Sequence, residues 1–163
     1  MDHLKLHILV VRKLGLICSF AITRAYRHDS PIFPRLMAAL SIVEFILCGD
    51  AAYLSRLSCK MVSEKKGIAF FKIKKNVSAK KKGVKAWYEI VMLFKSMPWG
   101  YLLIYRLRVY VEAIFGAVKQ RFDHQIYSRI WFMQRRELGL KVISHNVKQL
   151  LYIQEAKDSD IPL

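Results

Sequence analysis

Four residues with side chains suited to phosphate chemistry recur at helical spacing in the second half of the chain. Tyr105, Arg108, Glu112 and Lys119 form the pattern Tyr-x2-Arg-x3-Glu-x6-Lys. At about 100° per residue, a helix would bring all four side chains to one narrow stripe. A carboxylate flanked by two cations and a phenol can hold a divalent metal ion and bind phosphate at the same time. The alternative interpretation is an amphipathic helix with an ordinary charged stripe.

A second carboxylate follows an apolar segment in the first half of the chain. Ser41–Cys48 is apolar and β-branched apart from Glu44, which predicts a central strand buried on both faces. Gly49 would end this strand, and Asp50 comes next. Because α/β sheets bind ligands at the carboxyl ends of their strands, Asp50 is a candidate metal ligand. As an alternative, Gly49 and Asp50 form a turn in which the aspartate caps the next helix.

The rest of the pattern predicts the elements that would position these residues. Leu4–Val11 and Leu14–Arg24 predict an antiparallel hairpin, and Ile68–Ile73 predicts a further strand. Asp29 or Ser30 would cap the first helix. Helices are predicted over Phe33 to about Leu40, Leu54–Lys66, Trp87–Met97, Tyr101–Phe122 and Ser128–Tyr152. This mixture indicates an α/β fold, with one domain over residues 1–155 and a polar tail over residues 156–163.

The net charge is the strongest signal in the composition. Within 163 residues, 28 Lys and Arg oppose 12 Asp and Glu, which gives a formal net charge of +16. Such an excess predicts a polyanionic partner, with nucleic acid first and an anionic membrane surface second. Residues 72–85 contain seven lysines and predict a mobile basic loop. Its cluster of Lys80, Lys81 and Lys82 is either a DNA contact or simply a solvated loop.

Several other classes of protein fit the sequence poorly. The apolar segments Leu14–Thr23 and Leu36–Gly49 are too short, or too interrupted by charge, to cross a bilayer, and no signal peptide is evident. The three cysteines form no Cys-x2-Cys pair, and the five histidines lack the spacing of zinc ligands. We therefore expect a cytoplasmic, nucleoid-associated protein with buried, reduced thiols and no integral membrane association. Trp87, Trp99 and Trp131 are expected in the core.

These motifs together resemble a known family of DNA-processing enzymes. Besides the Tyr-Arg-Glu-Lys pattern, the family order is matched by the segments KLHILVV, RAYRHDSP, CGDAAYLS, IAFFKIKKN and SRIWFMQRRELGLKVISHNVKQLL. Over nearly its whole length the chain resembles the C-terminal two-thirds of the catalytic domain of DDE-type insertion-sequence transposases. The resemblance implies a ribonuclease-H-like mixed sheet flanked by helices. It also implies DNA transposition by metal-dependent phosphodiester cleavage and strand transfer.

The resemblance implies roles for individual residues as well. Asp50 and Glu112 match the second and third catalytic carboxylates, which bind Mg²⁺ or Mn²⁺ in a two-metal site. Tyr105, Arg108 and Lys119 match positions that contact DNA phosphate near the cut. The implied partner is DNA, both the ends of a mobile element and its target.

The family's first catalytic aspartate has no good counterpart in this sequence. In the family it lies on a strand upstream of the KLHILVV segment, where Asp2 is the only acid and stands too close to that segment. We therefore expect an N-terminally truncated catalytic domain that lacks its first strand, has an incomplete two-metal site and is inactive alone. A second copy or another transposase fragment would have to supply the missing aspartate.

A binding function is the main alternative to catalysis. A catalytically dead protein would hold duplex DNA without sequence preference, through the lysine loop and the basic last helix, and with steep salt dependence. A peripheral membrane protein is a third hypothesis. It has less support, because neither terminus has the basic amphipathic segment that membrane attachment would need.

Overall fold

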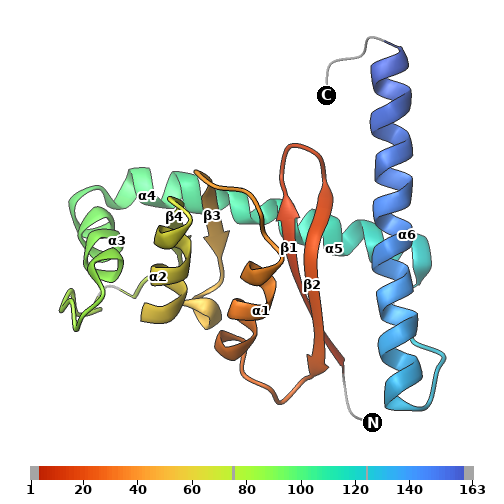
Figure 1. The fold of residues 1–163 in the computed structure, drawn as a ribbon, viewed down its shortest axis with the longest axis horizontal. Coiled ribbons are helices and arrows are strands. Elements are labelled where there is room, and N and C mark those ends of the chain that lie inside the picture. Colours follow the sequence, from red (N-terminus) through yellow and green to blue (C-terminus); the bar gives the residue numbers. More distant parts are fainter. Residues whose placement is uncertain (1–3, 75, 124, 160–163) are drawn as a thin grey trace. The chain divides into compact units, whose positions relative to one another are not determined.

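The chain folds as a mixture of helices and small sheets. The structure is a computed structural model that describes residues 4–74, 76–123 and 125–159. Asp2 and the last four residues of the predicted polar tail lie outside these ranges. The chain divides into two compact units, of which the first comprises residues up to Tyr26 and from Tyr110 onward, and the second Arg27–Val109. Figure 1 labels the elements of both units.

The first unit is built on an antiparallel hairpin. Strand β1 (Leu4–Val11) pairs along its length with β2 (Leu16–Arg24). Gly15 closes the turn with a φ of +65°, in a left-handed conformation that glycine adopts without strain. The predicted hairpin is confirmed, although its second strand begins at Leu16 and not at Leu14.

Two helices complete the first unit, α5 (Val109–Phe122) and α6 (Trp131–Asp158). Helix α6 packs against β2 (Figure 1), where the side chain of Asn146 takes the place of a neighbouring strand. Its amide nitrogen donates to the carbonyl of Ile17 at 2.7 Å, and its oxygen accepts from the Ile17 amide at 2.9 Å. Both backbone groups are thereby satisfied in a partly buried position. The helix predicted over Ser128–Tyr152 begins later and extends further than the sequence pattern indicated.

The core of the first unit combines residues from the hairpin and both helices. Ile17, Val118 and Val142 are buried together, and apolar residues of β1 and α5 pack around them. His145 is also buried, and its Nε2 bonds the carbonyl of Gly15 at 3.1 Å. These contacts hold α6 and α5 to the hairpin.

The second unit is centred on two parallel strands. Strands β3 (Ile46–Gly49) and β4 (Ile68–Phe71) pair in register, so their carboxyl ends lie side by side. Asp29 takes the N-cap position of the first 3₁₀ turn but makes no side-chain capping bond there. The remaining elements are the 3₁₀ turns η1 (Ser30–Ile32), η2 (Ala51–Tyr53) and η3 (Arg106–Arg108) and the helices α1 (Phe33–Ala38), α2 (Arg56–Glu64), α3 (Lys85–Ser96) and α4 (Pro98–Tyr105).

Tyr101 attaches α4 to the end of β4. Its buried hydroxyl accepts a hydrogen bond from the Phe71 amide at 2.9 Å and donates one to the Phe71 carbonyl at 2.8 Å. Burial raises the pKa of the Tyr101 hydroxyl, which keeps it protonated and able to donate. The ring packs against Phe70 and Phe94, with centroid distances of 4.9 and 5.3 Å. The segment that follows α4 is thereby brought to the carboxyl ends of the strands.

The predicted central strand over Ser41–Cys48 is confirmed only at its end, and its first five residues are not part of a strand. Strand β3 begins only at Ile46, and residues 41–44 are exposed. Glu44 adopts a φ of +59°, and its amide donates to the Lys65 carbonyl at 3.0 Å, so the chain turns before the strand begins. The predicted single mixed sheet is also not seen, because the described residues form two separate two-stranded sheets.

The helix predicted over Tyr101–Phe122 is interrupted. It begins earlier, at Pro98, which is well suited to the first turn of a helix, and η3 separates α4 from α5. A 3₁₀ turn has about three residues per turn, so side chains three positions apart eclipse one another. The guanidinium of Arg108 accordingly lies over the ring of Tyr105, 5.8 Å from its centroid. The narrow stripe predicted for a regular helix is therefore altered at Arg108.

The close approach of β3 and β4 gives a first prediction. We expect Gly49→Ala to lower the free energy of unfolding by about 1–3 kcal/mol, since overpacking a filled core has this cost. The added methyl would lie 2.8 Å from Cε1 of the fully buried Phe71. As a control, Gly116→Ala in α5 meets nothing within 4 Å and should raise stability by about 0.5–1 kcal/mol. Denaturant unfolding followed by circular dichroism compares the two, and equal effects would contradict the account.

Candidate functional site

Asp50 lies where the two parallel strands end. It follows β3 directly and takes the N-cap position of η2, where its carbonyl accepts a hydrogen bond from the Tyr53 amide at 3.0 Å. Its side chain makes no capping bond to η2, and α2 is capped instead by Ser55, which accepts from the Ser58 amide at 3.0 Å. The turn interpretation therefore explains the backbone of Asp50 but not its carboxylate, whose side chain is 54% exposed.

Arg108 and Tyr105 are placed beside Asp50 by the end of α4. Nη1 of Arg108 lies 3.2 Å from Oδ1 of Asp50. Turn η3 packs against β3, and the Cys48 thiol donates to the Ile104 carbonyl at 3.3 Å, which holds the end of the helix next to the strand. Burial raises the pKa of the Tyr105 hydroxyl; Arg108 opposes this shift and Asp50 adds to it. The structure thus brings together three of the predicted site residues, with a phenol that remains a hydrogen-bond donor.

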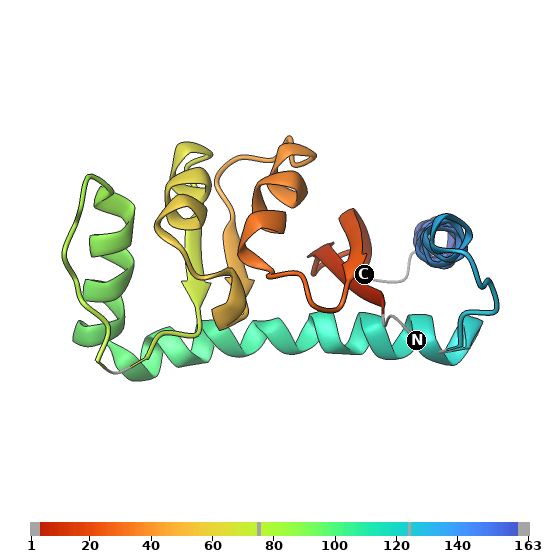
Figure 2. The same ribbon diagram turned by 90° about the horizontal axis from the view of Figure 1, so that it is seen from below.

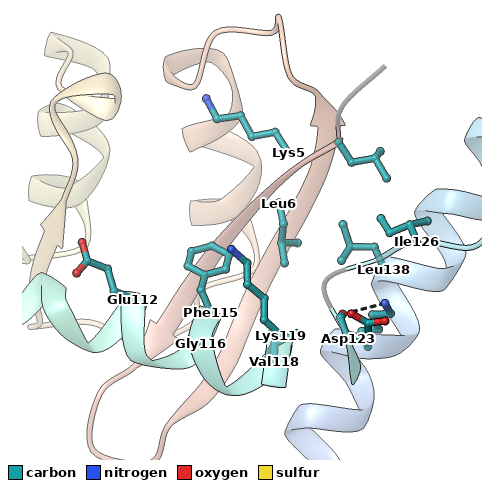
Figure 3. A pocket seen from close by; sticks show the side chains of 12 residues that line it. Lys5, Leu6, Glu112, Phe115, Gly116, Val118, Lys119, Asp123, Ile126 and Leu138 are labelled. Atoms are coloured by element: carbon teal, nitrogen blue, oxygen red, sulfur yellow. Dashed lines mark hydrogen bonds between the residues drawn. The ribbon is translucent and has the colours of Figure 1, made fainter. Parts of the chain in front are cut away.

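Glu112 and Lys119 line a cleft in the first unit, with a volume of about 650 Å³ (Figure 3). They lie in the first and last turns of α5, seven residues apart, and therefore on the same side of the helix. Strand β1 contributes Lys5 to the cleft, and α6 contributes Lys141. The four-residue pattern is consequently divided, because Glu112 and Lys119 belong to the first unit and Tyr105 and Arg108 to the second.

The walls of this cleft are mainly apolar. They comprise Leu4, Leu6, Phe115, Val118, Ile126 and Leu138, and Figure 3 shows Phe115 projecting from α5 between Glu112 and Lys119. Charged groups next to apolar walls interact more strongly with a bound ion than they would in open water. Such a cleft suits an anion that carries an apolar or flat group, as nucleotides do.

Lys141 has a structural role in the wall of the cleft. Its ammonium group donates to the carbonyl of Asp123 at 3.1 Å and to that of Gln125, and lies 3.8 Å from the Glu137 carboxylate. Burial opposes the ionisation of Glu137, but hydrogen bonds from the amides of Ser128 and Tyr127 outweigh it and lower its pKa. Residues 125–128, which precede α6, are therefore held by a charged network, and Lys5 and Lys119 contribute two further cations to the cleft. No sequence signal placed Lys5 here, because its position depends on how β1 packs against α5.

The lysine loop between β4 and α3 is anchored at two points. The indole nitrogen of Trp87 donates to the Ser78 carbonyl at 2.9 Å, and Nη2 of Arg56 donates to the Lys80 carbonyl at 3.3 Å. Arg56 also stacks on Trp87, with its guanidinium carbon 4.6 Å from the ring centroid. The side chains of Lys80–Lys82 are exposed. The loop is thus held at Ser78 and Lys80, and Lys80–Lys82 present their cations to solvent.

The tryptophans follow the sequence expectation only in part. Trp87 is buried, as predicted, but Trp99 is 83% exposed, and the prediction of a core position for it is wrong. Trp131 is half-buried, and its ring centroid lies 5.2 Å from the guanidinium carbon of Arg24 and 5.9 Å from that of Arg135. These cation–π contacts leave both arginines near the surface of the first unit.

Two further predictions concern the burial of the three cysteines and the absence of membrane-spanning helices. Cys59 is buried, and burial raises the pKa of its thiol to about 12, whereas Cys18 and Cys48 are half-buried. Within the described ranges, none of the helices combines the length and the apolar character needed to cross a membrane.

The carboxylates of Asp50 and Glu112 are the kind of ligand that a hard divalent cation prefers, but there are only two of them in the proposed site. Mg²⁺ prefers oxygen ligands, which Asp50 and Glu112 would supply. Among residues 4–74, 76–123 and 125–159, however, no group of three His, Cys, Asp or Glu side chains is placed to hold a metal ion.

Comparison with known proteins gives one match. Residues 2–147 match the family model described as "Transposase DDE domain", a range that includes Asp50, Glu112 and the lysine loop. Searches of the curated proteins and of the solved structures gave no match.

The exposed lysine loop gives a second prediction. We expect the triple substitution Lys80→Gln, Lys81→Gln, Lys82→Gln to weaken binding to any duplex DNA. It should reduce the slope of log K against log salt by up to about 0.9 for each lost phosphate contact. Fluorescence anisotropy over a range of salt concentrations measures this slope.

The matched control removes the same charge elsewhere, with Lys13→Gln, Lys60→Gln and Lys66→Gln at three exposed positions. This control should change the slope less than the loop variant does. A loop variant with the parental slope would exclude the loop from the DNA interface.

Proposed function

The chain belongs to the transposase DDE domain family, and on that premise we propose that it acts on DNA in transposition by metal-dependent cleavage of phosphodiester bonds and strand transfer. Members of the family generally depend on a divalent metal ion. We propose a ribonuclease-H-like arrangement for the complete catalytic domain, in which β3 and β4 are two strands of a larger sheet. In such sheets, ligands bind at the carboxyl ends of the strands, where Asp50 lies.

The observation that carries this proposal is the pairing of Asp50 with Arg108. A carboxylate and a guanidinium 3.2 Å apart offer neighbouring positions for a cation and for a phosphate oxygen. Because both side chains are partly exposed, the ion pair contributes only about 0–1 kcal/mol and is easily separated. In the DNA complex, Arg108 would turn to a phosphate oxygen and leave the Asp50 carboxylate available for a metal ion.

Glu112 is the second carboxylate of the proposed site. In a two-metal site, these carboxylates would hold Mg²⁺ or Mn²⁺ ions, of which one would activate the attacking hydroxyl and the other would stabilise the leaving oxygen. Lys119 and Lys5, at the cleft that Glu112 lines, would bind phosphates next to the cut, and Tyr105 would donate a hydrogen bond to the DNA backbone. The counterpart of the family's first catalytic aspartate would come from outside the described residues, either from a second copy of the chain or from another transposase polypeptide.

Non-specific DNA binding without cleavage is the second candidate function. It is favoured by the formal net charge of +16, and also because the described residues hold no group of three possible metal ligands. It would require only the exposed cations of the lysine loop and of α6. Either function would place the protein on nucleoid DNA in the cytoplasm.

Plasmid nicking distinguishes the two candidates. We expect the chain alone to bind supercoiled plasmid in Mg²⁺ or Mn²⁺ without nicking it. Nicking should appear when a second transposase of the same family is added. This second protein keeps its first catalytic aspartate but carries a substitution of its third catalytic carboxylate, so that it cannot cleave DNA by itself. In this mixture, Glu112→Gln and Asp50→Asn should each reduce the nicking rate by more than about 100-fold, since even outer-shell partners of a metal contribute 10–100-fold.

Glu64→Gln is the control, because Glu64 is an exposed carboxylate paired with Lys60 on α2. Its nicking rate should equal that of the parent. Nicking that survives Glu112→Gln would contradict the proposed site, and DNA binding without nicking in the mixture would favour the binding function.

A further inference from the structure

Strand β4 bonds β3 along one edge, and its backbone amides and carbonyls face that edge and the opposite edge in turn. The Ile68 amide donates to the Phe45 carbonyl at 2.9 Å, so the polar backbone groups of Ile68 face β3. Those of Phe71 face the opposite edge, where both of them bond the Tyr101 hydroxyl. Because the direction alternates from one residue to the next, the amide and carbonyl of Ala69 share this outer edge with those of Phe71.

The backbone groups of Ala69 at the outer edge are buried. No residue in the described ranges forms a hydrogen bond with them on that side. Ala69 is 0% exposed. Buried backbone donors and acceptors are nearly always paired, because an unmet group forfeits the hydrogen bond that it makes with water in the unfolded chain. Ala69 therefore offers one donor and one acceptor to a molecule bound next to this edge.

A cavity of about 280 Å³ lies next to Ala69. One of its walls is α3, which lies on the side of β4 opposite to β3 (Figure 1 and Figure 2). The residues that α3 contributes recur at the spacing of a single helical face: Ala86, Glu89, Ile90 and Leu93. Helix α2 contributes Cys59 and Ser63. Pockets for drug-sized molecules begin at roughly 300 Å³, so this cavity suits a compact ligand.

The lining of the cavity favours a neutral ligand. Burial raises the pKa of the Cys59 thiol to about 12, so this group is uncharged at neutral pH. The carboxylate of Glu89 lies 3.1 Å from Nζ of Lys85 and is half-exposed. The described lining contains no lysine or arginine, so an anion such as a DNA phosphate would meet only a carboxylate there.

We propose that this cavity binds a small, neutral cyclic amide. The ring holds the amide in the cis form, in which its N–H and its C=O point to the same side. The ligand N–H donates to the Ala69 carbonyl, and the ligand C=O accepts from the Ala69 amide. The apolar part of the ring lies against Ile90 and Leu93.

Tyr101 shows that one small group can reach both backbone groups of a single residue at this edge. Its hydroxyl oxygen lies 2.9 Å from the Phe71 nitrogen and 2.8 Å from the Phe71 oxygen. Ala69 lies two residues earlier on the same edge, so the N–H and C=O of a cis-amide can meet it in the same way. The proposed ligand contacts neither Asp50 nor Glu112, so the inference goes beyond the proposed function and does not depend on it.

Nuclear magnetic resonance of the full chain, labelled with ¹⁵N-alanine, tests the proposal in about 0.5 M salt, which keeps nucleic acid off the protein. The probe is isocarbostyril, a neutral bicyclic lactam. It should shift the assigned amide signal of Ala69 saturably, with a dissociation constant on the order of 1 mM, as expected for a ligand of this size. N-Methylisocarbostyril has no N–H to donate and should bind at least about ten-fold more weakly.

Ser63→Trp tests the position of the site, because Ser63 is an exposed residue of the lining. The indole should obstruct the cavity and weaken isocarbostyril binding at least about ten-fold, since a filled cavity has no room for the ring. Lys60→Trp is the matched control. Lys60 is exposed on the same helix but lies outside the described lining, so this variant should bind like the parent.

Circular dichroism confirms that both variants have the helical content of the parent. A parent whose Ala69 signal shows no saturable shift would overturn the proposal. Equal affinity for the two probes, or undiminished binding by the folded Ser63→Trp variant, would overturn it as well.

Discussion

The hydroxyl of Tyr101 holds α4 against the end of β4, and the geometry around Asp50 depends on this attachment. Because the hydroxyl both accepts from and donates to the backbone of Phe71, α4 is fixed in position and direction at the strand end. The 3₁₀ turn that follows then packs against β3 and delivers Arg108 to Asp50. The buried side chain of Tyr101 thereby positions the Asp50 carboxylate and the Arg108 guanidinium next to each other at the carboxyl end of the short parallel sheet.

The identities of the candidate residues could be read from the sequence, but their surroundings could not. A short apolar segment followed by Gly49 was enough to place Asp50 after a strand, and strand alternation with Gly15 was enough to predict the hairpin. The 3₁₀ turn at Arg106–Arg108 had no such signal, since the helical pattern of polar and apolar residues continues through it. The turn depends on packing against β3, and that contact joins residues distant in the sequence.

One error of the sequence analysis and one omission have a common cause. The β-branched residues Ile42 and Val43 have high strand propensity, but the left-handed turn at Glu44 places them outside any ladder. The spacing of Leu140, Ile143 and Val147 is visible in the sequence as well. Only the structure shows that this face is exposed and that Asn146 and His145 direct the opposite face to the hairpin. Local patterns describe which residues share a face, and tertiary contacts decide what covers it.

The function proposed here requires Asp50 and Glu112 to serve one metal-dependent site on DNA. Hydroxyl-radical cleavage of the protein backbone by Fe²⁺, bound in place of Mg²⁺ in the presence of DNA, tests this requirement most directly. The account predicts cuts near both residues, competed by excess Mg²⁺ and lost at both positions in the Asp50→Asn variant. Cuts near only one of the two residues, or cuts near Glu112 that persist without the Asp50 carboxylate, would contradict it.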